Sequence, residues 1–254
     1  MEHALVRPPS NALRRAVVGN AAGPPPDPVR ARMQHAAYVA ALRDLGVVVK
    51  VLPPAEEEPD ACFVEDQAVV YAGIAVITRC GHPARRPEAG AIADALAVVL
   101  PLVRMEAPAT LDGGDVLPVG RTLFVGRSRR TNAAGIAFLR EVMAPRGIAV
   151  REVPVPAGTL HLQSVCSALD DDTVLLARGT VPAVALPGVA RILEVPAEEA
   201  YAANAVAVGE DVLLPAGYPV TARRVAEAGY RVHPLPMDAF RAADGALTCL
   251  SLRW

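Results

Sequence analysis

The chain has few of the features that nucleic-acid-binding and membrane proteins need. Its 254 residues carry a formal net charge of -2, and Lys50 is the only lysine among 25 basic residues. The arginines are dispersed and form no basic stripe, so we expect no nucleic-acid partner. No apolar run approaches the roughly 20 residues that a membrane-spanning helix requires, so we expect no membrane partner either.

Cysteine is also scarce, and its spacing excludes the common metal-binding motifs. Cys62, Cys80, Cys166 and Cys249 stand far apart and form no C-x-x-C pair, so we expect no bound metal. The first residues lack the basic segment and apolar stretch of a secretory signal. Reduced thiols in the cytoplasm are therefore the simplest expectation. Residues 19–28 are rich in Gly and Pro but lack a phosphate-loop pattern, which indicates an exposed connection.

Hydrophobic residues, 52% of the chain, suffice for one sizeable core, and their order predicts short strands alternating with helices. A strand, a tight turn and a second strand recur from Phe63, Leu111, Leu160, Ala203 and Leu247, at steps of 48, 49, 43 and 44 residues. This period indicates a closed array of like units, with an N-terminal strand at 4–6 completing the last unit. We expect helices over 29–46, 88–100 and 221–228, and another that follows residues 129–132 and runs to about 146.

Carboxylates gather where the sequence otherwise predicts strands. Glu65 and Asp66 lie inside the strand-like run 63–71, and Asp60 comes just before it. Buried carboxylates are costly unless they meet a cation, so the three together favour a site for a positively charged ligand. Glu65 alone would suit the polar face of an edge strand. Asp112, in an Asp-Gly-Gly-Asp motif, is a further candidate, with a simple turn as the alternative.

A histidine and a cysteine complete the set of candidates. His161 stands between two leucines in the predicted strand 160–169, so it should project to the face opposite theirs. Cys249 lies in a predicted terminal strand, 247–252, where a lone cysteine is usually a buried apolar residue. The carboxylates and the histidine upstream favour a nucleophilic thiol instead. The acidic run 170–172 falls where a hairpin turn belongs, and we interpret it as solvated.

Six stretches together resemble the dimethylarginine dimethylaminohydrolase family of the guanidine-modifying superfamily. The resemblance covers the whole chain, and its motifs are specific only in combination. It implies an α/β fold: a five-bladed ββαβ propeller (pentein) closed by the N- and C-terminal strands. Residues 1–254 would form a single catalytic domain with the active site on the axis. The stretches are 63–66, 111–115, 130–132, 160–162, 203–204 and 248–252.

The resemblance also implies a role for each candidate residue. Cys249 corresponds to the nucleophile and His161 to the general acid and base. Asp112 corresponds to the carboxylate that binds the guanidinium and orients His161. The remaining candidates would bind substrate: Glu65 and Asp66 the guanidinium end; Asp60, Arg85 and Arg130 the amino and carboxylate groups; and Val17, through its main chain, the substrate beside them.

The reaction implied is hydrolysis of asymmetric dimethylarginine or monomethylarginine to citrulline and dimethylamine or methylamine, through a thiouronium intermediate on cysteine. A thiolate attacks the resonance-stabilised guanidinium better than water does, and a cationic substrate favours the thiolate form. Paired carboxylates can grip the planar fork of nitrogens. A small molecule is the expected partner, and this chemistry requires no metal or organic cofactor.

Other functions stay open at this stage. Arginine deiminases release ammonia by the same chemistry, but they typically carry an inserted helical domain, for which 254 residues leave no room. Amidinotransferases share the cysteine and the histidine but need an amine acceptor. A related propeller is a non-enzymatic ribosome-binding factor, which would not need an inward set of cysteine, histidine and carboxylates. The oligomeric state, with a homodimer as one option, and a lid within residues 17–28 also stay open.

Overall fold

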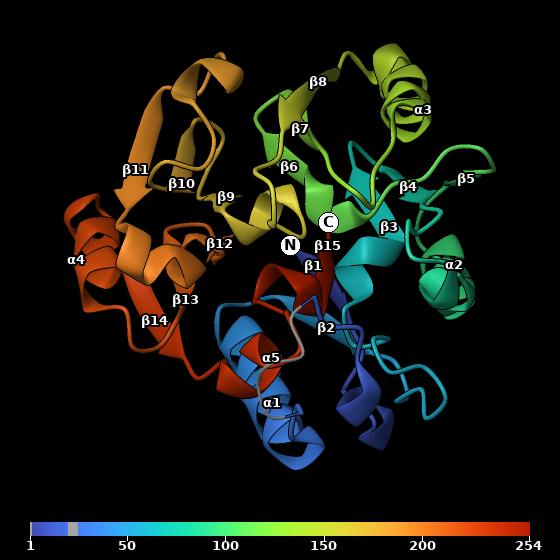
Figure 1. The fold of residues 1–254 in the computed structure, drawn as a ribbon, viewed down its shortest axis with the longest axis horizontal. Helices are drawn as coiled ribbons and strands as arrows, with labels where there is room; N and C mark the ends of the chain where they lie inside the picture. Colours follow the sequence, from blue (N-terminus) through green and yellow to red (C-terminus); the bar gives the residue numbers. More distant parts are fainter. Residues whose placement is uncertain (1, 20–24) are drawn as a thin grey trace.

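Five small sheets stand around a central axis (Figure 1). The computed structural model describes residues 2–19 and 25–254, so residues 20–24 of the expected lid lie outside the described residues. Within each sheet an inner strand pairs antiparallel with a middle strand, which pairs in parallel with an outer strand. From inner to outer, the sheets are β3 Ala68–Tyr71, β4 Ile74–Ile77 and β5 Leu102–Arg104; β6 Val116–Val119, β7 Thr122–Arg127 and β8 Ala149–Pro154; β9 Cys166–Ala168, β10 Thr173–Ala177 and β11 Arg191–Val195; β12 Val206–Val208, β13 Asp211–Pro215 and β14 Arg231–Leu235; and β15 Ser251–Arg253, β1 His3–Val6 and β2 Val48–Val51.

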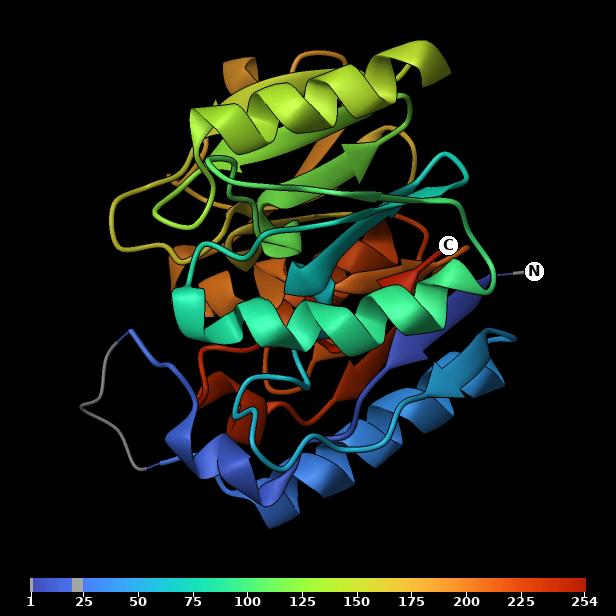
Figure 2. The same ribbon diagram turned by 90° about the vertical axis from the view of Figure 1, so that its right-hand side faces the viewer.

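The two ends of the chain close the ring of sheets. β15 pairs antiparallel with β1, with Val6 opposite Ser251. Backbone hydrogen bonds join His3 and Trp254 in both directions, at 2.8 and 3.0 Å, and their rings stack with centroids 5.6 Å apart. Figure 2 shows the first and last strands side by side. The expected propeller and its closure by the terminal strands are confirmed.

Helices connect the middle strand to the outer strand in four of the five sheets, because a parallel pair needs a crossover. The helix starts follow from their caps: Asp27 accepts from the Val29 N–H at 2.9 Å, and Asn132 accepts from the Gly135 N–H at 2.8 Å. No helix among residues 2–19 and 25–254 has the length and apolarity to cross a membrane. The crossover helices, all four predicted, are α1 Pro28–Asp44, α2 Ala89–Ala97, α3 Ala133–Met143 and α4 Pro219–Glu227. The sheet of β9, β10 and β11 has the 3₁₀ turn η7 Ala183–Ala185 instead, and a short helix α5 Asp238–Arg241 follows β14.

A 3₁₀ turn precedes each inner strand, and here the sequence prediction was wrong. Strands had been expected through 63–67, 160–165 and 247–250, with His161 alternating against its neighbours. His161 is instead the residue before a turn, and Cys249 lies within one. Alternating apolar residues indicate burial on one side, which a tight turn provides as well as a strand does. The turns are η2 Val64–Gln67, η4 Gly113–Asp115, η6 Leu162–Ser164, η8 Ala197–Ala203 and η9 Thr248–Leu250.

Apolar side chains fill the spaces between neighbouring sheets and their helices. Tyr38, Phe124 and Phe240 are among the largest that are fully buried. Burying one such side chain stabilises the fold by about 1.5–3 kcal/mol. The Tyr38 hydroxyl meets Ser251 Oγ at 2.8 Å, which ties α1 to the last strand and satisfies a buried polar group. This packing holds the five axial turns in a fixed arrangement.

Candidate active site

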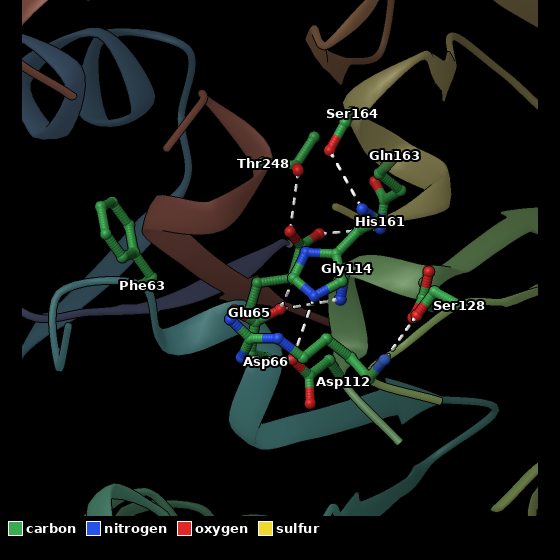
Figure 3. Close-up of polar contacts among 12 residues, drawn as sticks. Phe63, Glu65, Asp66, Asp112, Gly114, Ser128, His161, Gln163, Ser164 and Thr248 are labelled. Carbon is green, nitrogen blue, oxygen red and sulfur yellow. Dashed lines mark hydrogen bonds and ion pairs between the residues drawn. The ribbon is translucent and has the colours of Figure 1, made fainter. Parts of the chain in front are cut away.

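His161 lies between two buried aspartates (Figure 3). Its Nε2 is 3.0 Å from Asp112 Oδ2, and its Nδ1 is 3.8 Å from Asp66 Oδ1. Burial alone would lower the pKa of His161, but the charge of Asp66, the hydrogen bond that His161 donates to Asp112 and the charge of Asp115 together raise it to about 9. The imidazole is therefore protonated at neutral pH, and it can deliver a proton.

Asp112 stands behind the imidazole and is fully buried. Its Oδ1 accepts the Gly81 N–H at 2.8 Å, and Arg130 Nη1 lies 3.5 Å from its Oδ2. Burial would raise the pKa of this carboxyl, but the His161 hydrogen bond and charge hold it below its usual range. Asp112 lines neither of the cavities described below. This geometry suits the orientation of His161, whereas contact between Asp112 and a guanidinium stays a prediction.

Asp66 presents one oxygen to the histidine side and the other to an arginine. Its Oδ1 accepts the Gly114 N–H at 3.1 Å, and its Oδ2 accepts from Arg85 Nη1 at 2.5 Å. A Cβ on Gly114 would lie 2.8 Å from His161 Nδ1 and 3.0 Å from Asp66 Oδ1. Only a glycine permits this close approach, which explains the Gly-Gly pair inside the acidic motif.

A closed ring of hydrogen bonds links four of the five blades around the axis. Glu65 accepts from Gln163 Nε2 at 2.9 Å and from Thr248 Oγ1 at 2.8 Å. Asn204 Nδ2 donates to Thr248 Oγ1 and to the Gln163 carbonyl, both at 2.9 Å, while its Oδ1 accepts the Thr248 N–H at 3.0 Å. Figure 3 shows Thr248 and Gln163 each meeting a different oxygen of the Glu65 carboxylate. The ring fixes the backbone immediately before Cys249.

Cys249 is the one partly exposed cysteine; the other three are buried. Burial raises the pKa of its thiol well above the usual value, and the charges of Glu65 and Asp66 raise it further. Burial likewise raises the pKa of Glu65 to about 7, with Asp66 adding to the shift. In the absence of a cation the thiol is therefore protonated. A cationic group beside these carboxylates would lower the pKa of the thiol and favour the thiolate.

Two adjoining cavities meet at His161 and Cys249. The larger, about 520 Å³, is also lined by Glu65, Gly114, Thr159 and Tyr201 among others, and its size suits a small molecule. The smaller one is lined on its far side by the other predicted binding residues: Val17, Asp60, Asp66, Arg85 and Arg130. Every predicted site residue except Asp112 therefore lines one cavity or both.

The residues expected to bind the α-amino and α-carboxylate groups of the substrate lie together, although some of them already have hydrogen-bond or ion-pair partners within the protein. Both carboxylate oxygens of Asp60 lie 3.2 Å from the Val17 N–H. The Arg85 guanidinium is buried against Asp66 and Glu88, with Nη2–Oε2 at 2.9 Å for the latter. The side chain of Arg130 is slightly exposed beside the cavity. Of the two arginines, Arg130 therefore has the weaker interactions within the protein and is the more available to bind a substrate carboxylate.

Sequence reasoning missed Gln163, Asn204 and Thr248 as parts of the site. A positional signal was present: Glu65, Gln163 and Thr248 each stand three residues before an inner strand that begins at 68, 166 and 251. Asp66 and Cys249 likewise stand two residues before theirs. Aligning the repeats on their inner strands would have revealed that these side chains point to the same axis.

Asp66, Asp112 and His161 could in principle hold a metal ion, since one ligand atom from each lies within 4.8 Å of the others. These groups already have partners, however. Arg85 pairs with Asp66, and Arg130 and Gly81 contact Asp112. The guanidinium groups of Arg85 and Arg130 already supply the positive charge that a metal ion would bring to these carboxylates. The arrangement suits a cationic organic ligand better than a metal.

A five-bladed propeller with a cysteine, a histidine and carboxylates converging on its axis defines the class of this protein: a pentein-fold enzyme. The family model described as "N,N dimethylarginine dimethylhydrolase, eukaryotic" matches residues 27–186. The chain is 35% identical to N(G),N(G)-dimethylarginine dimethylaminohydrolase of Pseudomonas aeruginosa over 100% of its length and 99% of the relative's. It is 40% identical to the enzyme of that name from Streptomyces coelicolor, over 98% and 96% of the two chains. The chain therefore belongs to the dimethylarginine dimethylaminohydrolase family.

Solved structures agree with this placement. A cysteine-to-serine mutant of the Pseudomonas aeruginosa enzyme, complexed with citrulline, matches with a TM-score of 0.93 over 99% of this chain and 98% of that one, at 35% identity. A histidine-to-glycine mutant of a dimethylarginine dimethylaminohydrolase, as an adduct with S-methyl-L-thiocitrulline, matches equally well, with a TM-score of 0.93. The N-terminal domain of a cyanobacterial arginine dihydrolase matches with a TM-score of 0.88 but only 20% identity, which shows a shared fold.

Proposed function

We propose that the protein hydrolyses asymmetric dimethylarginine and monomethylarginine to citrulline and dimethylamine or methylamine. The observation that carries the proposal is the convergence of Cys249, protonated His161 and the carboxylates of Glu65 and Asp66 on one cavity system. Relatives at 35–40% identity over nearly the whole chain bear the name of this activity, and one is complexed with citrulline. A small-molecule substrate follows from both.

The first step is formation of the thiolate inside the complex. The substrate guanidinium would lie against Asp66 and Glu65, which otherwise raise the pKa of Cys249. A bound cation offsets their charge and lowers that pKa, so the thiol releases its proton to solvent once the guanidinium is bound beside it. Carboxylates that hold two guanidinium nitrogens also fix the central carbon for attack.

Attack and departure follow. The Cys249 thiolate forms a bond to the central guanidinium carbon, and the bond from that carbon to the methylated nitrogen breaks. His161 gives its proton to the departing amine, which leaves as dimethylamine or methylamine. The remaining neutral imidazole accepts a proton from water as the water attacks the thiouronium carbon. The hydroxyl group on that carbon then releases its remaining proton to solvent, the carbon–sulfur bond breaks, and citrulline forms as the thiolate returns.

The other end of the substrate would lie in the smaller cavity. Asp60 suits the α-amino group, and the main chain of Val17 lies beside that carboxylate. Arg130 suits the α-carboxylate, and Arg85 adds positive charge while it anchors Asp66. Agmatine, which lacks the carboxylate, should therefore be a poor ligand. No step of this mechanism requires a metal or an organic cofactor.

The arginine deiminase alternative is not favoured. The arginine dihydrolase neighbour is only 20% identical, whereas the dimethylarginine dimethylaminohydrolases reach 35–40%. A non-enzymatic propeller would have no use for the paired carboxylates around His161. We further propose a single catalytic domain over residues 1–254, a cytoplasmic location that keeps Cys249 reduced, and a homodimer as the oligomeric state to examine first.

Product analysis with purified protein tests the proposal. Asymmetric dimethylarginine, monomethylarginine, arginine and agmatine are each incubated with the enzyme, and citrulline, dimethylamine, methylamine and ammonia are quantified together. We expect equal amounts of citrulline and alkylamine from the methylated substrates, little from arginine and none from agmatine. Preferential ammonia release from arginine would assign the protein to the deiminases.

A further inference from the structure

We propose that Asp115 is a positioning residue that holds His161 and the Arg130 loop, residues 128–131, in one arrangement for catalysis. The proposal rests on the function proposed above. Asp115 ends the turn η4 and is fully buried. It lines neither cavity at the site, so it acts through other residues and not on the substrate.

The Asp115 carboxylate receives three hydrogen bonds from two different segments. Its Oδ2 accepts from Ser128 Oγ at 2.6 Å and from Thr131 Oγ1 at 2.7 Å. Its Oδ1 accepts the Leu162 N–H at 2.9 Å, directly after His161. One buried charge thus joins both ends of the Arg130 loop to the segment that carries the histidine.

The two hydroxyl groups pass this constraint on to site residues. Ser128 Oγ accepts the backbone N–H groups of Arg130 at 3.0 Å and of Thr131 at 3.2 Å. Thr131 Oγ1 accepts the Asp112 N–H at 3.2 Å. Because Ser128 Oγ already accepts two N–H groups, its own hydrogen needs an acceptor, and Asp115 supplies it. The backbones of Arg130 and Asp112 therefore depend on the Asp115 carboxylate.

An amide at position 115 cannot reproduce this arrangement. Asparagine has one acceptor oxygen and two N–H donors, whereas the carboxylate serves three donors with two oxygens. Space is also limited, since a Cβ on Gly126 would lie 2.8 Å from Asp115 Oδ1 and 2.6 Å from Val155 Cγ2. Asp115 is fully buried beside the strand β7, so a lost acceptor would not be replaced by solvent.

Charge adds a second consequence. The ionisable groups that face His161 are Asp66, Asp112 and Asp115, with Cys249 on the same two cavities, Glu65 further round the axis and Arg130 beside Asp112. Asp115→Asn removes one of three negative charges that raise the pKa of the imidazole. A role limited to general stability would leave that pKa unchanged.

Asp115→Asn tests the proposal, with Glu199→Gln as the matched control. Glu199 is also a buried carboxylate that accepts three hydrogen bonds, from Val220 N, Thr221 N and Thr221 Oγ1, at 3.1, 2.7 and 2.7 Å, and neither it nor its donors line either cavity at the site. We expect Asp115→Asn to lower kcat/KM for asymmetric dimethylarginine about 100-fold, with a rise in KM. We expect NMR titration to show the His161 pKa lowered by about one unit. Glu199→Gln should change neither.

Ser128→Ala keeps the test decisive if Asp115→Asn fails to fold. This smaller change removes the acceptor of the Arg130 N–H, so KM should rise about tenfold while kcat changes little. A wild-type His161 pKa and wild-type KM in Asp115→Asn, or a wild-type KM in Ser128→Ala, would overturn the proposal. If the wild-type protein does not hydrolyse methylated arginines, the proposed function fails by itself, and the His161 titration still decides the role of Asp115.

Discussion

Replacing Asp112 by asparagine removes the charge that stands 3.0 Å from His161 Nε2 and changes the side chain's size very little. Carboxylates around His161 raise its pKa from 6.5 to about 9, and one pKa unit corresponds to about 1.4 kcal/mol. Loss of one partner of a buried ion pair costs about 3–5 kcal/mol. If most of that loss falls on the transition state, kcat decreases about a thousandfold.

The kinetic pattern is as informative as the size of the loss. If Asp112 acts only by orienting His161, as its absence from both cavities suggests, KM should change little while kcat falls. A rise in KM would instead support the predicted contact between Asp112 and the guanidinium. Citrulline formation is measured over a range of asymmetric dimethylarginine concentrations. Asp171→Asn is the exposed control and should retain full activity, since Asp171 lies in a solvated turn. Equal kcat in Asp112→Asn and Asp171→Asn would refute the assignment and leave Asp112 as a turn residue.

Three further predictions concern the nucleophile, the axial ring and pH. Cys249→Ser should abolish citrulline formation while the thermal midpoint of unfolding stays close to wild type, and an unaltered rate would exclude Cys249 as nucleophile. Thr248→Val removes both side-chain hydrogen bonds of Thr248 in the ring and should lower kcat about tenfold. Ser167→Ala, which removes a buried hydroxyl group in the same region, is the control and should not lower kcat. Equal effects of the two substitutions would show that the ring has no specific role in catalysis. The raised pKa of His161 stabilises the fold fully below pH 6.5, and this contribution, at most about 3 kcal/mol, is lost as pH rises through about 9. Between about pH 4.5 and 7 the stability lost through Glu65, whose pKa is raised to about 7, is opposed by His35, whose pKa is lowered to about 4 by burial. The test window is therefore pH 7 to 9, where the free energy of unfolding in urea should fall, and a rise there would contradict the assignment of His161.

The regular parts of the fold could be predicted because their signals are local. Alternating apolar residues marked the hairpins, and helical spacing with caps such as Asp27 marked the crossovers. The recurring unit then implied a closed array of like units, including pairing of the first and last strands, and the family resemblance implied the five-bladed propeller. What failed was the assignment of the axial segments as strands. Their side chains are buried by contact with other blades, and the sequence of one blade alone does not reveal those contacts.

The chemical type of the site could be predicted from the sequence, but the set of residues predicted for it was incomplete. His161 and Cys249 were identified by residue type together with family resemblance, and both line the cavities. Asn204 and Asp115 were not assigned roles, because their importance lies in hydrogen bonds between blades. Polar residues of this kind look like ordinary turn residues until the five turns are brought together. Aligning the repeats recovers the axial positions, but only the packed structure shows which oxygen each donor meets.

The most direct test of the central claim is capture of the covalent intermediate on Cys249. His161→Gly protein is treated with S-methyl-L-thiocitrulline, quenched in acid and digested with trypsin. Cleavage after Arg241 and Arg253 yields the peptide 242–253, in which Cys249 is the sole cysteine. The account predicts that mass spectrometry finds this peptide carrying the probe minus methanethiol, and that Cys249→Ser abolishes the adduct. An adduct on Cys62, Cys80 or Cys166, or none on 242–253, would contradict it.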